Sequence, residues 1–450
     1  MTPYVITFIV MVGVFMIGCF AFKLPVGVSM LIAALCGALE GGLGTETIRM
    51  MVEGEFGYVD TILTIGCAMI FMKVIEGSGA LDALSSLIIE KFHRFPAVLL
   101  VLIMLIASLI IQRFHKVPAL MLIFIMIIIM FPGMITGSST AAVLSAGSIM
   151  APVLALMGID AVTSGSIIAM GALLGMIAPP VNTAALIICA GIDVPYVGFE
   201  GPLALITFPL AILFVLLLGY KQARHMDYEK LKPALEKQDA IRKQYGVRIY
   251  IPLLVLVALM VIFKVLKLGE DIGMPLMFLI SAAVGLFTGK KINVLTAVPE
   301  AIRTAAPVMG ILMGVGMFIE VMTATGVRGL VVISCLRLPS TLWLLACAIS
   351  IPLFGAVSSY GACSVLGVPF AYIYASLLGG NSVVVLAAIS LIAAVGDMMP
   401  PTALAGLFAA QVTGVEKYTK ILKRCIVPII ILLVYACFFL ANSKLIAGLF

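Results

Sequence analysis

The sequence predicts an all-α polytopic membrane protein built from two related halves. Of its 450 residues, 63% are hydrophobic and 11% are charged, whereas soluble domains are about half apolar and about a quarter charged. Its apolar runs are long and almost free of charge, as membrane-spanning helices require, and they lack the alternating pattern of a transmembrane barrel. This composition excludes a soluble or disordered protein, a secreted disulfide scaffold and a nucleic-acid-binding protein.

The apolar segments are the expected helices, and one basic stretch divides them into two groups. The first group lies at roughly 4–22, 24–41, 59–76, 96–111, 117–135, 141–157, 163–191 and 202–220. The second group lies at roughly 249–266, 272–288, 304–323, 341–357, 360–378, 382–412 and 426–447. No basic region or A-x-A-like site flanks the first segment, so we expect a retained helix and not a cleaved signal. Several segments are too short, or too interrupted by Gly and Pro, to be simple spans of about 20 residues.

Charge placement predicts the topology. The stretch 221–248 contains eight Lys or Arg and four Asp or Glu, which indicates a cytoplasmic linker by the positive-inside rule and not a nucleic-acid patch. Residues 40–60 carry five acids and one Arg and are expected to be external, whereas the basic residues of 91–94 are expected to be cytoplasmic. The N-terminus is then external.

Cysteine and histidine usage gives no support to a disulfide, a zinc site or an iron–sulfur site. The chain has nine Cys, scattered in or beside apolar segments, and three His, and it contains no CxxC pair. We therefore expect no disulfide, no zinc or iron–sulfur site and no cofactor, with the Cys side chains acting as small apolar packing groups.

The two sides of the linker resemble one another. Phe71 matches Phe318 and Gly79 matches Gly326, both with a shift of 247, and in each half a Ser-Ser pair precedes a Pro-Pro pair by 41 or 42 residues. The flanking charges indicate opposite orientations, and such inverted repeats are typical of secondary transporters. We expect a first repeat over 1–219 (scaffold helices in 1–58, hairpin and broken helix in 117–191), a linker over 220–248, and a second repeat over 249–450 (scaffold helices in 249–290, hairpin and broken helix in 341–412). About 23 surplus residues in the first half leave the topology near 96–135 open.

Two polar stretches resemble the tips of re-entrant hairpins. They are Gly137-Ser138-Ser139-Thr140 and the run 355–361, which contains Ser358, Ser359 and Tyr360. Backbone at membrane depth must be satisfied by protein or water, so such tips line a cavity. Hydroxyls and free carbonyls suit Na⁺, and the N–H groups of the following helix suit an anion. The alternative is that Gly and Ser only allow close helix packing.

Two Pro pairs predict broken helices. Pro179-Pro180 and Pro400-Pro401 lie inside apolar runs, where each pair removes two donors and ends the helix. The freed carbonyls can hold a cation, and Asn182, Thr183 and Thr402 add side-chain oxygens. The alternative is a structural kink, which is common in membrane helices.

Few ionisable residues lie inside the predicted spans. Asp397 stands three residues before Pro400 and is a candidate for cation binding or proton relay, because intramembrane acids are costly. Lys73, Glu76 and Glu320 lie near segment ends, where long side chains can reach the surface.

Two amphipathic stretches, 45–56 and 291–303, occupy corresponding positions in the two halves. We expect both to lie flat at opposite membrane surfaces and to brace one domain against the other. Ordinary interfacial loops are the alternative.

At these residues the chain resembles the large membrane subunit of a TRAP (tripartite ATP-independent periplasmic) transporter, within the ion-transporter superfamily. The resemblance is carried by Gly137-Ser138-Ser139, 147–152, Gly171-Ala172-Leu173 through Pro179-Pro180, Gly316-Met317-Phe318 and Pro400-Pro401. It implies an elevator fold, with a static scaffold and a mobile domain carrying two hairpins. It also implies Na⁺-driven uptake of an organic acid in a bacterial inner membrane, with a small membrane subunit and a periplasmic substrate-binding protein.

The sequence therefore predicts a secondary transporter of a small organic anion, such as a C4-dicarboxylate or sugar acid. The expected cation-binding residues are Gly137, Ser138, Ser139, Thr140, Pro179, Asn182, Ser358, Ser359, Asp397, Pro400 and Thr402. The expected substrate-binding residues are Ser139, Thr140, Asn182, Thr183, Ser359, Tyr360 and Thr402. A proton-coupled carrier that uses Asp397 is the alternative, and a channel or an intramembrane enzyme is a more remote one.

Overall fold

The structure is a computed structural model, and every secondary-structure element that it describes is a helix. It describes residues 3–80, 117–224, 244–265, 274–337, 339–356, 359–400 and 403–450. In these ranges, 7 helices are long and apolar enough to cross a membrane: Pro3–Phe20, Ala119–Thr136, Ser139–Leu156, Glu200–Ala223, Val294–Ala324, Ser359–Leu377 and Tyr418–Ala441. The prediction of an all-α, multi-pass membrane protein is confirmed. The predicted segment 96–111 lies outside the described residues.

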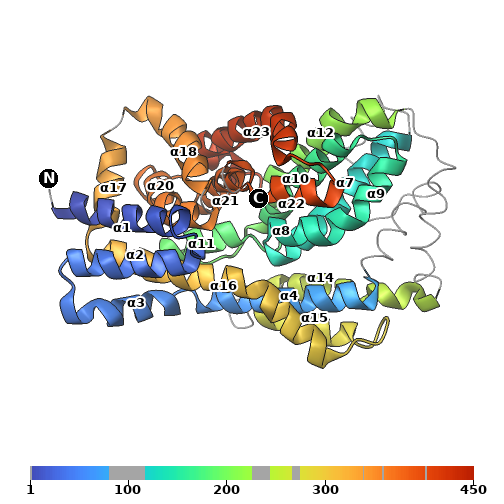
Figure 1. Ribbon diagram of the computed structural model, residues 1–450, viewed down its shortest axis with the longest axis horizontal. Helices are drawn as coiled ribbons and strands as arrows, with labels where there is room; N and C mark the ends of the chain where they lie inside the picture. Colours follow the sequence, from blue (N-terminus) through green and yellow to red (C-terminus); the bar gives the residue numbers. More distant parts are fainter. Residues whose placement is uncertain are drawn as a thin grey trace.

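The helices form two layers, the lower of which in Figure 1 we call the support layer. It contains α1 (Pro3–Phe20), α2 (Val26–Glu40), α3 (Thr47–Phe56), α4 (Val59–Ser78), α14 (Ile251–Val265), α15 (Met274–Gly285) and α16 (Val294–Ala324). Here α16 packs against α2, α3 and α4, and α15 packs against α4. Glycines allow these helices to touch through their backbones: a Cβ on Gly27 would lie 2.1 Å from the Gly310 carbonyl oxygen, and one on Gly54 would lie 2.4 Å from that of Gly316. Such small-residue contacts are typical of helices packed in membranes.

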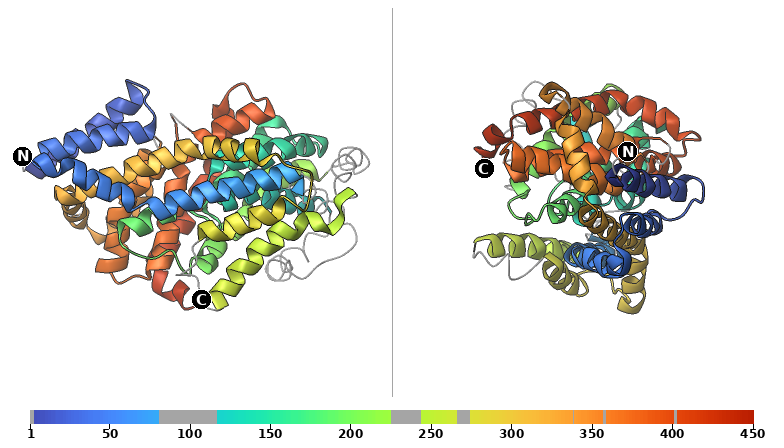
Figure 2. Two further views of the ribbon diagram at one scale, coloured as in Figure 1. Left: turned by 90° about the horizontal axis from the view of Figure 1, so that it is seen from below. Right: turned by 90° about the vertical axis from the view of Figure 1, so that its left-hand side faces the viewer.

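The upper layer, which we call the hairpin layer, comes from both sides of the linker (Figures 1 and 2). Its first part contains α7 (Val117–Thr136), α8 (Ser139–Ala142), the π-helical turn η2 (Val143–Gly147), α9 (Ser148–Leu156), α10 (Ala161–Ile177), α11 (Thr183–Gly191) and α12 (Glu200–Ala223). Its second part contains α18 (Ser340–Gly355), α19 (Ser359–Ala362), η4 (Cys363–Gly367), α20 (Val368–Ala371), η5 (Tyr372–Leu377), α21 (Ser382–Ala394), η6 (Val395–Met398), α22 (Leu404–Thr413), α23 (Tyr418–Ala441) and α24 (Ser443–Ala447). Along the chain, α17 (Val327–Leu336) follows α16 of the support layer and precedes α18 of the hairpin layer. Short 3₁₀ turns occur at η1 (Gly44–Glu46) and η3 (Gly246–Tyr250).

Helix α10 is the centre of the hairpin layer. It is buried continuously from Thr163 to Ile177 and packs against α7, α12, α22 and α23. Asp160 starts this helix by accepting a hydrogen bond from the Thr163 N–H at 3.1 Å, as an N-cap does. It ends at the Pro pair that follows Ala178, and the equivalent run in the second part is interrupted between α21 and α22. Both predicted breaks are therefore present.

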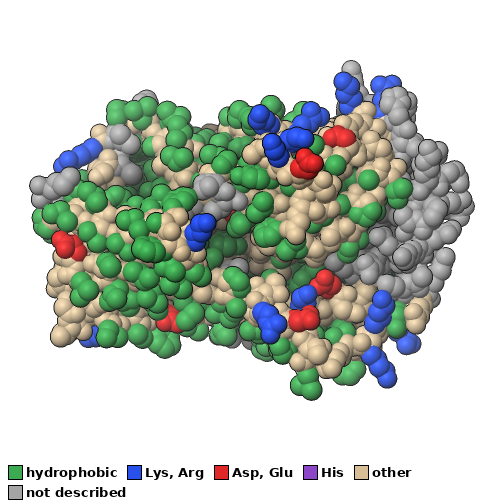
Figure 3. Space-filling model, viewed as in Figure 1, with side chains coloured by type: hydrophobic (Ala, Val, Ile, Leu, Met, Phe, Trp, Pro, Cys, Tyr) green, Lys and Arg blue, Asp and Glu red, His purple; other side chains and the backbone are tan. Residues whose placement is uncertain are grey.

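One predicted element differs from the structure. The stretch 291–303 is not a separate interfacial helix over its whole length, because α16 runs unbroken from Val294 to Ala324 and includes Pro299 and Pro307. Proline is tolerated within membrane helices when neighbouring helices re-satisfy the freed backbone groups. The corresponding first-half stretch does form a separate short helix, α3. Figure 3 shows that apolar side chains dominate the visible face of the described residues and that charged ones are sparse.

Candidate functional site

The first hairpin tip lies between α7 and α8. Gly137 has φ +62°, and a Cβ there would lie 2.1 Å from the Thr183 hydroxyl oxygen, so only glycine fits both the backbone and the space. The next residue, Ser138, caps α8 by accepting a hydrogen bond from the Ala141 N–H at 3.3 Å. The tip is thereby packed directly against the start of the broken helix segment α11.

The second tip lies between α18 and α19 and meets the first one. Tyr360 donates a hydrogen bond from its hydroxyl to the Gly137 carbonyl oxygen at 2.8 Å. Behind this tip, a Cβ on Gly396 would lie 2.6 Å from the backbone of Gly355. The second hairpin therefore packs against its own broken helix as closely as the first does, and the two tips are joined by a hydrogen bond.

Asp397 connects the two halves of the chain at this point. It lies in η6 and is only 6% exposed. The hydroxyl of Ser139 donates to its carboxylate across 258 positions of sequence, and Ser359 is a second side-chain partner. One buried acid is therefore held by hydroxyls from both tips. A buried carboxylate requires a cation, a proton or several donors.

Polar contacts hold the first broken helix against the first hairpin and against the second broken helix. The Val181 N–H donates to the Met134 carbonyl oxygen of α7 at 3.0 Å. Asn182 is fully buried; its side-chain oxygen caps α11 by accepting from the Ala185 N–H at 2.9 Å, and its amide nitrogen donates to Ser390 at 2.8 Å. Asn182 thus links the two broken helices to each other.

A cavity of about 450 Å³ lies between the two layers at the hairpin tips. The hairpin layer contributes polar side chains to its wall, namely Ser138, Ser139, Thr140, Ser359, Tyr360 and Asp397. The support layer contributes α2, α4 and α16, with apolar side chains such as Met69 and Met72 and the charged pair Lys73 and Glu76. A pocket of this volume is large enough for a small organic molecule.

The structure distributes the sequence-predicted residues over three positions. Ser138, Ser139, Thr140, Ser359, Tyr360 and Asp397 line the cavity. Gly137, Asn182 and Thr183 are buried in the packing behind it, and the helix breaks are marked by Pro179, which is half-buried, and Pro400, which is exposed. Ser358 and Thr402 lie outside the described residues.

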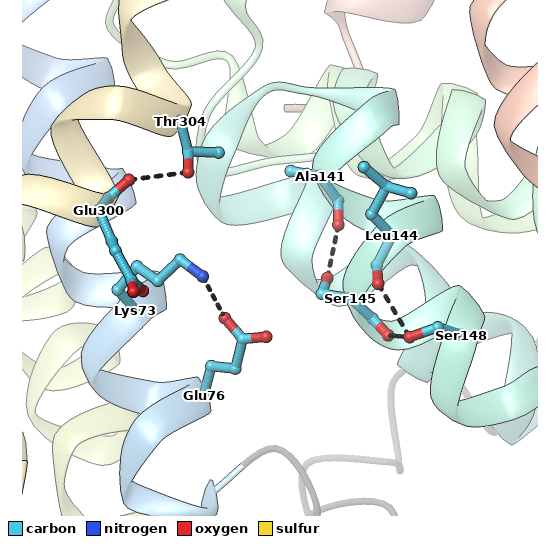
Figure 4. A network of polar contacts seen from close by, with 8 residues as sticks. All are labelled: Lys73, Glu76, Ala141, Leu144, Ser145, Ser148, Glu300 and Thr304. Carbon is cyan, nitrogen blue, oxygen red and sulfur yellow. Dashed lines mark hydrogen bonds and ion pairs between the residues drawn. The ribbon is translucent and has the colours of Figure 1, made fainter. Parts of the chain in front are cut away.

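The structure places Lys73 and Glu76 at the cavity, a position that the sequence analysis did not predict for them. They form an ion pair of 3.1 Å in the last turns of α4, with side chains 30% and 43% exposed. Figure 4 shows them across a gap from the turn of the first hairpin that carries Ser145 and Ser148. The sequence signal was a Lys and a Glu three residues apart in an apolar run. Their place near a segment end predicted a surface position. Their place at the cavity could not be predicted in this way, because the cavity walls come from segments that are distant along the chain.

The fold and the site together define a multi-pass helical membrane protein in which two hairpin tips, Asp397 of the second broken helix and the support layer line a cavity. Residues 125–442 match the family model described as "Tripartite ATP-independent periplasmic transporter, DctM component". This match covers more than half of the chain, so the protein belongs to that transporter family. A search of curated proteins found no match.

Proposed function

We propose that this chain is the large membrane subunit of an importer that couples Na⁺ entry to uptake of a small organic anion, a carboxylate. In this proposal the hairpin layer moves against the support layer and carries ion and substrate across a bacterial inner membrane. The linker near 220–248 is cytoplasmic and the N-terminus is external. A small membrane subunit and a periplasmic substrate-binding protein complete the system, as the name of the family suggests.

The observation that carries the proposal is the convergence on Asp397. The Asp397 carboxylate of the second broken helix and serine hydroxyls from both hairpins supply hard oxygen ligands of the kind that Na⁺ prefers. Binding a cation here neutralises a buried acid and links the two tips, so a filled site favours one compact arrangement of the hairpin layer.

The organisation of the elements supports an inverted duplication. In each half a hairpin with a π-helical turn in its second arm precedes a broken helix and a long terminal helix. In both halves a glycine four residues before the Pro pair, Gly175 or Gly396, touches the first arm of the hairpin through backbone. Repeats of this kind place substrate and ion sites at the bilayer midplane between them.

The test is thermal unfolding of the detergent-purified full chain in NaCl and in choline chloride at equal ionic strength. A ligand that binds only the folded state stabilises it by about 2.7 kcal/mol at a hundredfold excess over its Kd. We expect Na⁺ to raise the apparent Tm, Asp397→Asn to abolish that increase, and Glu320→Gln, which changes an acid of α16 distant from Asp397 in sequence, to retain it. An Asp397→Asn variant with the full Na⁺ response would refute the assignment. Absence of any Na⁺ effect, with a pH response that Asp397→Asn removes, would indicate the proton-coupled carrier instead.

A further inference from the structure

The described residues that line the cavity include more acidic than basic side chains. Among its described lining residues, Lys73 is the cation, and Glu76 and Asp397 are the acids. Glu300 of α16 is drawn on the same side of the gap as Lys73 in Figure 4. Among the described residues, an entering anion therefore meets one positive group at the lining, and that group is already paired with Glu76.

The ion pair is poised to be replaced by a ligand. Both side chains are partly exposed to the cavity, and exposed ion pairs contribute little net stability. A ligand carboxylate can take the place of Glu76 on the Lys73 ammonium with a charge-assisted hydrogen bond of equal kind. The exchange leaves Glu76 unpaired beside the ligand, so a second negative charge on the ligand would be repelled.

The other walls fit the remainder of such a ligand. On the hairpin side Ser138, whose oxygen caps α8, keeps its hydroxyl proton for a ligand carbonyl group. The oxygens of Ser139 and Tyr360, whose protons are donated to Asp397 and Gly137, can accept from a ligand hydroxyl group. Apolar side chains, among them Met69 and Met72, and the polar side chain of Thr304 complete the support side. The lining thus combines one cation, a group of hydroxyls and an apolar wall.

We infer that Lys73 is the carboxylate-binding residue of the cavity and that Glu76 selects against dianions, so that the transported acid is a monocarboxylate bearing a hydroxyl or carbonyl group and a short apolar chain. This inference rests on the proposed function for the identity of the site. It assigns to the support layer a residue that determines specificity. The ligand then contacts both layers at once, Lys73 on one side and the hairpin tips on the other.

The experiment compares two acids of equal carbon number, 2-hydroxybutanoate and malate, which differ in a methyl group against a second carboxylate. Binding is measured from the rise in apparent Tm of the full chain, titrated with each acid in NaCl and in choline chloride. Wild type is expected to respond to 2-hydroxybutanoate more strongly than to malate. In Lys73→Gln the apparent Kd for 2-hydroxybutanoate should rise roughly 10- to 100-fold, the effect of losing one hydrogen bond to a charged group, while the Na⁺ response persists. In Glu76→Gln the response to malate should increase.

The controls separate this inference from the proposed function. Lys290→Gln removes an exposed lysine beyond the end of α15 and should leave both responses unchanged, and Lys73→Arg should restore acid binding if Lys73→Gln is poorly folded. Retained acid binding in Lys73→Gln, a preference for malate in wild type, or no response to either acid overturns the inference. Loss of the acid response in Lys73→Gln in a protein without any Na⁺ response upholds the inference and refutes Na⁺ coupling.

Discussion

Substituting alanine for Gly175 tests whether the first hairpin is held by backbone contact. A Cβ at this position would lie 2.5 Å from the Met130 carbonyl oxygen and 2.7 Å from the Met130 Cα. An ordinary contact begins at 3.4 Å, so α7 and α10 must separate by about 0.9 Å (3.4 less 2.5). Both neighbours are backbone atoms, and no side chain can move aside to relieve the contact.

The expected cost follows from two opposing effects. Overpacking a close interface costs about 1–3 kcal/mol, whereas alanine in place of glycine inside a helix gains up to about 1 kcal/mol. Gly13, in α1, supplies the matched control, because a Cβ there meets nothing within 4 Å. Gly175→Ala should therefore be less stable than Gly13→Ala by about 1–3 kcal/mol, a difference in which the helix propensity cancels.

The assay is the apparent Tm of both variants in NaCl and in choline chloride. The displacement at Met130 lies about 10 Å along α7 from the tip at Gly137, so it should also misplace Ser139 against Asp397 and reduce the Na⁺-dependent shift. Gly13→Ala should keep that shift. A Gly175→Ala protein as stable as Gly13→Ala, with an undiminished Na⁺ response, would refute the reasoning.

Two further predictions concern the hairpin layer, one at the start of α10 and one at the second hairpin tip. Burial alone would raise the pKa of Asp160, but hydrogen bonds from Thr163 and Gln222 outweigh burial and lower that pKa. The Asp160 carboxylate therefore stabilises the folded state above about pH 4, and this stabilisation is lost as pH falls through the folded-state pKa. Asp160→Asn should flatten the acid limb of a Tm–pH curve, and an unchanged curve would contradict this. Tyr360→Phe removes the hydrogen bond to Gly137 and should cost about 0.5–1.5 kcal/mol, measured by thermal unfolding; a Tm equal to that of wild type would show that the tips do not depend on it.

Local chemistry made the helix breaks predictable. Proline lacks an N–H, so a Pro pair ends a helix wherever the fold places it, and α10 does stop before Pro179. The glycine and serine of the first tip are equally local, since a positive φ at Gly137 and a cap at Ser138 depend on adjacent residues. Composition alone was sufficient for the membrane class.

Long-range pairing could not be predicted in the same way. Ser139 and Asp397 are 258 residues apart, and nothing in the sequence next to either residue indicates that they meet. Similarly, Lys73 belongs to the cavity only because α4 packs opposite the first hairpin. The continuous α16 was missed because the amphipathic stretch 291–303 differs in character from the apolar stretch 304–323, although one helix contains both.

The glycine contacts of the support layer have a mechanical consequence. Where Gly27 meets Gly310 and Gly54 meets Gly316, backbone touches backbone, and such joints resist shear because no side chain can rearrange. At the cavity the support layer instead presents Met69 and Met72, whose unbranched thioether chains adapt to irregular neighbours. The helices of the support layer thus meet backbone to backbone, whereas at the cavity this layer presents side chains that can change shape without displacing the helices that carry them.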